Sequence, residues 1–291
     1  MRILSTADWH IRSTVPGCLD MTQSEWMEFQ RKSLECVGKI AVEMKVDEID
    51  VGGDLFHSEQ TSSYECVYMI QEFSERMHRT GIRFRMMAGN HDLINHSSSN
   101  LYRSAIGVLM NSRYVEAMDG TVRGCNFDED DYGDSRVIFK HVLTIPKNDI
   151  PFAGIECETP ESLLEKYPRA EVILTGDYHR NFEYHMDGRH VFNSGCFTRQ
   201  ASDFEGYEPG VYVVDLDNPS DCKFVKIGLE QKFNRNGAER KLVDESVEKF
   251  VAGIKKESVT LDYIGSLRNE LREREDNVKV RVEDWIGRSG N

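Results

Sequence analysis

Gly52-Gly53-Asp54-Leu55-Phe56-His57 ends an apolar run at residues 48–52, and it is the best starting point for predicting the fold. The run predicts a buried strand, and the two glycines allow the backbone to turn sharply after it. The Asp54 carboxylate then projects into a cleft, where its two oxygens can bridge two cations about 3.5 to 4 Å apart. This stretch therefore predicts a metal-binding edge of a buried sheet.

The segments around this stretch predict an α/β fold. Strands are expected at residues 2–7, 48–52 and 82–88, and helices at residues 24–44 and 64–79. Strands connected in this way run parallel, and ligands gather at their carboxyl ends. Two further polar motifs fall at such ends, namely Asp8-Trp9-His10 and Gly89-Asn90-His91-Asp92.

The chain beyond residue 100 predicts a second sheet, which makes the fold a two-sheet βαβ sandwich. Short strands are expected at residues 114–116, 121–122, 137–142, 172–175, 183–186 and 190–192, with 211–216 and 222–227 closing this second sheet. Asp187-Gly188 indicates a hairpin. His141 and Asp177-Tyr178-His179 lie at the ends of two of these runs, so a sandwich can bring them to the rim that carries the first motifs.

The C-terminal segment predicts a small ααβ appendage at residues 231–291, after a main domain at residues 1–230. Apolar residues recur at helical spacing between Leu242 and Leu271, and Val278, Val280 and Val282 alternate with charged residues. One interpretation of this pattern is that the appendage packs onto the main domain.

The composition limits the class of protein. With 291 residues and 39% hydrophobic residues, the chain can bury a large core. Seven scattered cysteines without a CxxC pair argue against a disulfide framework or a thiolate zinc site and favour the cytoplasm, and no apolar run is long enough for a bilayer. The formal charge of −14 is unfavourable for a nucleic-acid protein. Bound cations would nevertheless reverse the local field that a phosphate meets.

The polar motifs together supply oxygen and nitrogen ligands for two adjacent divalent metals and one spare imidazole. Such a metal pair holds phosphoryl oxygens and generates hydroxide at neutral pH, which suits the hydrolysis of phosphate esters. The Asn90 amide oxygen can bind a hard metal, whereas His91 faces another direction and can protonate a leaving oxygen. Asp92 is expected to hold the His91 ring in place.

With this order of motifs, the chain closely resembles the calcineurin-like metallophosphoesterases, and within them the SbcD family of recombination and repair nucleases, including phage-encoded members. The resemblance covers nearly all of the first 216 residues. Residues 52–57 and 89–92 look like the second and third blocks of the family, and Asn193-Ser194-Gly195-Cys196-Phe197-Thr198-Arg199 is similar to a segment typical of these nucleases.

The resemblance implies a set of site residues. One metal would be held by Asp8, His10, Asp54 and His179, and the other by Asp54, Asn90, His141 and Asp177, with His91 as the catalytic imidazole. Where the family usually has Gly-His-x-His, this chain has Gly176-Asp177-Tyr178-His179. The harder aspartate oxygen would lower the preference of the second site for softer ions.

The resemblance also implies an activity and partners. Family members usually use manganese, with magnesium as the other candidate here, and act on DNA as exonucleases and endonucleases. They pair with an SbcC-type coiled-coil ATPase and form homodimers, and no membrane is involved. We therefore expect a DNA nuclease subunit in the cytoplasm, or in the host cytoplasm if the chain is phage-encoded. The resemblance also implies a small capping domain over the DNA and a C-terminal helical segment for the ATPase, so residues 231–291 would cap the DNA or bind the partner. Packing of this appendage onto the main domain is an equally good interpretation.

Two other interpretations stay open. The negative net charge and the shared metal motifs also suit a phosphodiesterase for a nucleotide or another small phosphate ester. A non-catalytic DNA-end adaptor is a third possibility, which the metal ligands and His91 argue against. Near the motifs, His57 is expected in a loop or supporting role, and Trp9 is expected to cover the cleft rather than stack a base.

Overall fold

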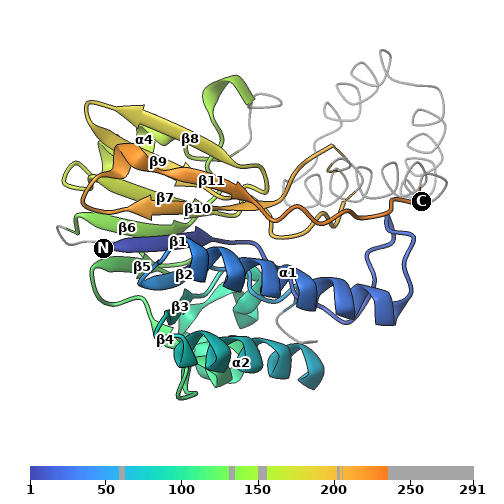
Figure 1. Cartoon of the computed structure of the whole chain (residues 1–291). Helices are drawn as coiled ribbons and strands as arrows, with labels where there is room; N and C mark the ends of the chain where they lie inside the picture. The colour runs from blue at the N-terminus through green and yellow to red at the C-terminus, as the bar shows by residue number, and fades with distance from the viewer. Residues whose placement is uncertain (59–62, 131–134, 150–155, 202–203, 205, 235–291) are drawn as a thin grey trace, which may run out of the picture. The chain divides into compact units, whose positions relative to one another are not determined.

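The computed structural model describes residues 1–58, 63–130, 135–149, 156–201, 204 and 206–234 (Figure 1). Its strands are β1 (Arg2–Thr6), β2 (Glu48–Gly52), β3 (Arg83–Met87), β4 (Glu116–Ala117), β5 (Val122–Cys125), β6 (Val137–His141), β7 (Val172–Gly176), β8 (Phe182–Met186), β9 (Arg189–Asn193), β10 (Gly210–Asp215) and β11 (Lys223–Lys226). Its α-helices are α1 (Gln23–Glu43), α2 (Tyr64–Arg79), α3 (Ala105–Met110) and α4 (Pro160–Lys166).

The chain divides into two compact units. The first comprises Met1–Val15 and Met21–Gln231, and the second comprises Pro16–Asp20 and Lys232–Asn291. Most of the second unit, including the expected ααβ appendage, lies outside the described residues. Its described part contains an antiparallel bridge between Leu19 and Phe233.

The first unit contains two sheets with helices on their outer faces (Figure 1). The first sheet has the order β11-β10-β1-β2-β3-β4, and β1, β2 and β3 are parallel neighbours, as predicted. The second sheet has the order β5-β6-β7-β9-β8. Its β8 and β9 form the predicted hairpin, in which Asp187 and Gly188 have φ angles of 52° and 75°.

Apolar residues that alternate along the strands create three core layers. Leu4, Ile49 and Phe84 pack with α1 and α2 on the outer face of the first sheet. The adjacent Ile3 turns to the other face, where it packs with Phe139 and Phe192 between the two sheets. Ile173 and Val191 pack with Leu163 and Leu164 of α4 on the outside of the second sheet. The α/β sandwich was therefore predicted correctly.

Two predictions of sheet membership were wrong. β10 and β11 do not close the second sheet, because β10 pairs antiparallel with β1 and β11 pairs with β10. Likewise β4, at the end of the expected strand 114–116, extends the first sheet beside β3. The local pattern located the strands but contained no information about their long-range partners.

Candidate metal centre

The predicted ligands gather at the carboxyl ends of five strands. Asp8 and His10 follow β1, Asp54 follows β2, Asn90 follows β3, His141 ends β6, and Asp177 and His179 follow β7. Four of them have a left-handed backbone, with φ angles of 54° for Asp8, 46° for His10, 50° for Asp54 and 81° for Asp177. Non-glycine residues rarely adopt this conformation, which is concentrated at functional sites.

One group of ligand atoms comes from Asp8, His10 and His179, whose donor atoms all lie within 4.8 Å of one another. The Nε2 atoms of His10 and His179 are 3.1 Å apart, and Nε2 of His179 is 3.9 Å from Oδ1 of Asp8. Two imidazole nitrogens and a carboxylate at these separations can bind one divalent cation.

A second group comes from Asp8, Asp54 and His141, again with donor atoms within 4.8 Å. Nδ1 of His141 lies 2.7 Å from the Gly52 carbonyl, to which it donates, so Nε2 is left to face the site. This Nε2 is 3.4 Å from Oδ1 of Asp54 and 3.0 Å from Oδ1 of Asn90. Asn90 therefore stands beside the second group, as the ligand prediction requires.

Asp177 has a contact that the sequence did not reveal. Its backbone N–H donates to both carboxylate oxygens of Asp8, at 3.1 and 3.2 Å. Burial raises the pKa of the Asp177 carboxyl, and His141 opposes that rise. The Asp177 side chain is absent from the three ligand groups found among the described residues, so its role as a ligand stays a prediction.

His91 stands at the rim of both groups, and it forms a third group with His10 and His57, whose donor atoms also lie within 4.8 Å of one another. Its side chain is 41% exposed, and its Nε2 lies 4.0 Å from Oδ2 of Asp54. Nδ1 of His91 lies 2.8 Å from the His57 carbonyl, which orients the ring with Nε2 toward the carboxylate. The His57 ring is 5.5 Å from the His10 ring, and burial lowers its pKa to about 4. His57 therefore supports His91 through its backbone.

The expected role of Asp92 in holding the His91 ring is wrong. The Asp92 carboxylate instead accepts the backbone N–H groups of Leu55, Phe56 and Gly89, at 3.1, 3.0 and 3.0 Å. It thereby ties the loop after β2 to the loop after β3. Burial of a carboxylate costs free energy, because the group loses its hydration. The three N–H donors compensate for this loss.

The donor set suits divalent cations. Buried Oδ2 of Asp54 and Nδ1 of His10 have no hydrogen-bond partner among the described residues. Burial alone would raise the pKa of the Asp54 carboxyl, but the neighbouring His141 overrides it and holds that pKa well below its usual range. Conversely, Asp54 overcomes the effect of burial on His141 and raises its pKa to about 10. The buried carboxylates thus stabilise a positive charge at this point, which a divalent cation can supply.

Trp9 is a core residue, so it is not available to stack a base, and the expectation that it covers the cleft was wrong. It is fully buried and stacks on Phe197 at 4.8 Å, and its indole N–H donates to Oγ1 of Thr6 at 2.8 Å. Its packing supports the loop between Asp8 and His10.

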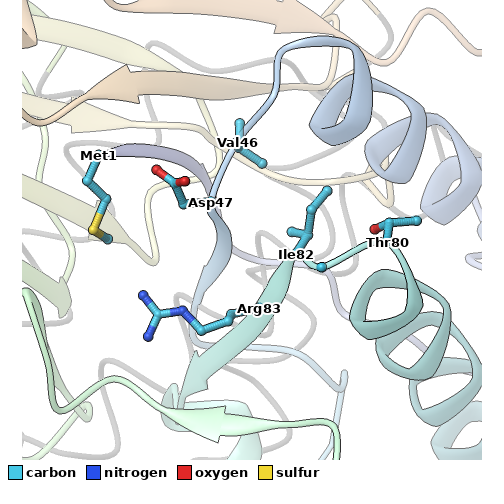
Figure 2. Close-up of a pocket in the computed structure, with 7 residues that line it drawn as sticks. Met1, Val46, Asp47, Thr80, Ile82 and Arg83 are labelled. Atoms are coloured by element: carbon cyan, nitrogen blue, oxygen red, sulfur yellow. The ribbon is translucent and has the colours of Figure 1, made fainter.

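A surface pocket lies at the opposite, amino ends of β1, β2 and β3 (Figure 2). Its charged residues have partners within the protein: Asp47 accepts the Arg2 backbone N–H at 2.7 Å, and Arg83 pairs with Glu48. This pocket contains neither ligand group of the metal centre.

The motifs and their geometry agree with the comparison to known families. Residues 1–181 match the calcineurin-like phosphoesterases, and the chain belongs to this family. This family is typically dinuclear and metal-dependent, and the chain contains residues suited to bind such metals.

Among individual relatives, the chain is 32% identical over 103 residues to a probable cyclic nucleotide phosphodiesterase of Psychrobacter arcticus. That match covers 35% of this chain and about a third (34%) of the relative. A Thermus thermophilus structure, TT1561, is 14% identical, with a TM-score of 0.45 over 78% of this chain and 98% of that chain. A novel archaeal phosphodiesterase is also 14% identical, with a TM-score of 0.39 over 78% of this chain and 99% of that chain.

Within the described part of the chain, no helix has both the length and the apolar character to cross a membrane.

Proposed function

We propose that this phosphoesterase hydrolyses phosphodiester bonds in DNA with two divalent metals, of which manganese suits the ligands best. The observation that carries the proposal is the half-exposed rim of the centre. The side chains of His91 and His179 are 41% and 36% exposed, whereas Asp8, Asp54 and His141 beneath them are buried. Such a rim is accessible to a phosphate within a polymer. The resemblance of residues 52–57, 89–92 and 193–199 to SbcD-type nucleases supports the same substrate.

Each residue has a definite task in this proposal. Asp8, His10, Asp54 and His179 would hold one metal, and Asp54, Asn90, His141 and Asp177 the other. When bound, the metal pair supplies Lewis acidity and an activated water. The His57 carbonyl keeps a proton on Nδ1 of His91, so its Nε2 can carry the proton that a departing alkoxide needs. Asp92 acts indirectly, by joining the loops that carry Asp54 and Asn90.

Manganese is favoured by the chemistry of the donors. Both proposed sites combine imidazole nitrogens with carboxylate or amide oxygens and contain no thiolate. Mixed nitrogen and oxygen sets accommodate manganese, while oxygen-rich sets also accept magnesium. Asp177, in place of the usual histidine, shifts the second site further toward oxygen.

The test compares substrates and metals in one assay. The purified chain is incubated with linear duplex DNA, single-stranded DNA, a chromogenic phosphodiester and a cyclic nucleotide, each with manganese, magnesium or chelator. We expect manganese-dependent cleavage of DNA. H91A should abolish most turnover while retaining bound metal, and H78Q, at a histidine on α2, serves as the control. Activity confined to the small esters would contradict the DNA assignment.

The second candidate is a phosphodiesterase for a nucleotide or another small phosphate ester. The relative named as a probable cyclic nucleotide phosphodiesterase and the formal charge of −14 favour it. Because a small ester needs no contacts beyond the metal pair, its hydrolysis should depend little on ionic strength. DNA cleavage should weaken as salt screens the phosphate backbone.

The partners belong to the same proposal. An SbcC-type ATPase and a second copy of this chain are the expected partners, and residues 231–291 are the proposed capping or ATPase-binding segment. The test is co-purification with an SbcC-type coiled-coil ATPase. The recovery of the ATPase is compared between the full chain and a chain that ends at Gln231. Equal recovery of the ATPase with both chains would remove the segment from the proposal.

A further inference from the structure

A second group of metal-binding side chains lies away from the catalytic centre, at the edge strands of the two sheets. Glu183 and His185 are on β8, which is the edge strand of the second sheet, and His190 is on β9. Cys222 immediately precedes β11, which is the edge strand of the first sheet. No metal chemistry was predicted for any of these residues from the sequence.

Strand register places the three residues of the second sheet on one face. His185 is paired with His190, and Glu183 with Phe192, in the antiparallel ladder. Directly paired residues share a face, and Phe192 belongs to the core between the sheets. The two histidines and Glu183 therefore turn toward the first sheet, from which Cys222 approaches.

The distances bring these groups into one neighbourhood. Sγ of Cys222 lies 3.5 Å from Oε2 of Glu183, and Nδ1 of His185 lies 3.9 Å from Oε1 of the same carboxylate. The His185 and His190 rings are 6.0 Å apart between centroids. Glu183 thus links a thiol from one sheet to an imidazole from the other.

His190 is the most buried of the three residues that the second sheet contributes to this group. It is only 7% exposed and stacks on Phe192 at 5.7 Å.

We propose that Cys222, His190, His185 and Glu183 form a binding site for a zinc-class divalent ion that joins the edges of the two sheets. One thiolate, two imidazoles and one carboxylate are four ligands of the types that tetrahedral zinc takes. In the metal-free structure no three of these four residues have donor atoms within 4.8 Å of one another, so metal binding requires side chains to rotate. The Glu183 and His185 side chains, 43% and 67% exposed, have the freedom to rotate onto the ion.

Binding at this site must release a proton. In the metal-free structure the Cys222 thiol donates to Oε2 of Glu183 at 3.5 Å. Coordination replaces the S–H bond with a sulfur–metal bond, and the thiol proton leaves to solvent. Affinity should therefore increase with pH.

Cobalt(II) provides a probe that separates this site from the catalytic centre. The reduced full chain is titrated with cobalt after its catalytic centre has been filled with manganese. A thiolate-to-cobalt charge-transfer absorption is expected, and the proposed catalytic ligands contain no sulfur that could produce it. Displacement of that absorption by zinc would establish the class of ion.

Matched variants assign the signal to its residues. C222S should abolish the absorption, whereas C36S, at another half-buried cysteine, should leave it intact. E183Q, an exposed position that should not affect folding, should weaken cobalt binding at least about tenfold, as should H190Q. Absence of the absorption in the cobalt-saturated native chain would overturn the proposal, as would its persistence in C222S. Because the readout does not involve hydrolysis, it is independent of the proposed nuclease function.

Discussion

Asp54 contacts both halves of the metal centre, since its carboxylate approaches His141 at 3.4 Å and His10 at 3.7 Å. We expect D54N to lose metal from both sites and to reduce hydrolysis by more than about 100-fold, a larger loss than a supporting residue causes. Metal content after dialysis and the hydrolysis rate measure this effect. The exposed D119N is the control, and a metal-replete D54N would contradict the shared role.

Asp92 offers a second test at the same scale, because its carboxylate accepts three backbone N–H groups. In D92A these donors are left without their acceptor, at a cost of about 1 to 3 kcal/mol for each one that stays unsatisfied. We expect a lower free energy of unfolding in urea, with partial recovery in D92N. An unchanged unfolding curve in D92A would contradict this stabilising role.

Individual side chains were easier to select from the sequence than to orient. Asp8, His10, Asp54, Asn90, His141 and His179 do converge, because strand ends bring them to one rim. The sequence could not reveal the hydrogen bond from the Asp177 main chain to Asp8, nor the His57 carbonyl that orients His91. Both depend on backbone groups, which have the same chemistry at every residue.

At the scale of elements, β2 contains an unusual buried charge cluster. Glu48 and Asp50 are fully buried beside Arg85, whose Nη1 and Nε lie 3.3 and 3.4 Å from their respective carboxylates. Burial, with the neighbouring Glu48, raises the pKa of Asp50 to about 8. One deeply buried guanidinium balances one carboxylate, so the second carboxyl keeps its proton.

This cluster predicts how stability depends on pH. The unfolded chain ionises Asp50 near pH 4, whereas the folded chain keeps it protonated up to about pH 8. The native state then binds more protons than the unfolded state, so the free energy of unfolding should fall as the pH rises from about 4 to about 8. Urea denaturation across this window should show a flatter slope for D50N, with D119N as control. Identical slopes in D50N and the native chain would contradict it.

The elements themselves show which sequence signals are sufficient. The bounds of α2 and β2 were predicted correctly because helical periodicity, a run of apolar residues and flanking polar residues define them locally. The short helices α3 and α4 were missed. They have only six and seven residues, which is less than two full turns, so they show too little helical periodicity to be recognised. The place of β10 beside β1 depends on a pairing across more than half the chain, which no local pattern encodes.

At the scale of the whole molecule, the metal centre should contribute to folding. Three carboxylates, Asp8, Asp54 and Asp177, repel one another without cations, and a ligand that binds only the native state stabilises it. Manganese at 100 times its dissociation constant should add about 2.7 kcal/mol. We expect chelator to lower the melting temperature of the native chain and manganese to restore it.

The control for this prediction is D54N, whose melting temperature should not respond to manganese. Calcium, which prefers sets of oxygen ligands, should restore less stability than manganese. A melting temperature that is insensitive to chelator and to every divalent ion would argue against a metal pair in this fold.

The left-handed backbone at Asp8, His10, Asp54 and Asp177 has a consequence for how the protein can change over time. Each such residue holds a conformation that only glycine adopts freely, at a cost of about 1 to 3 kcal/mol. Replacement of any of them by glycine would relax the chain while deleting a metal ligand. In homologues that are no longer selected for catalysis, we therefore expect glycine at these positions. Such proteins should be more stable to unfolding but catalytically inactive.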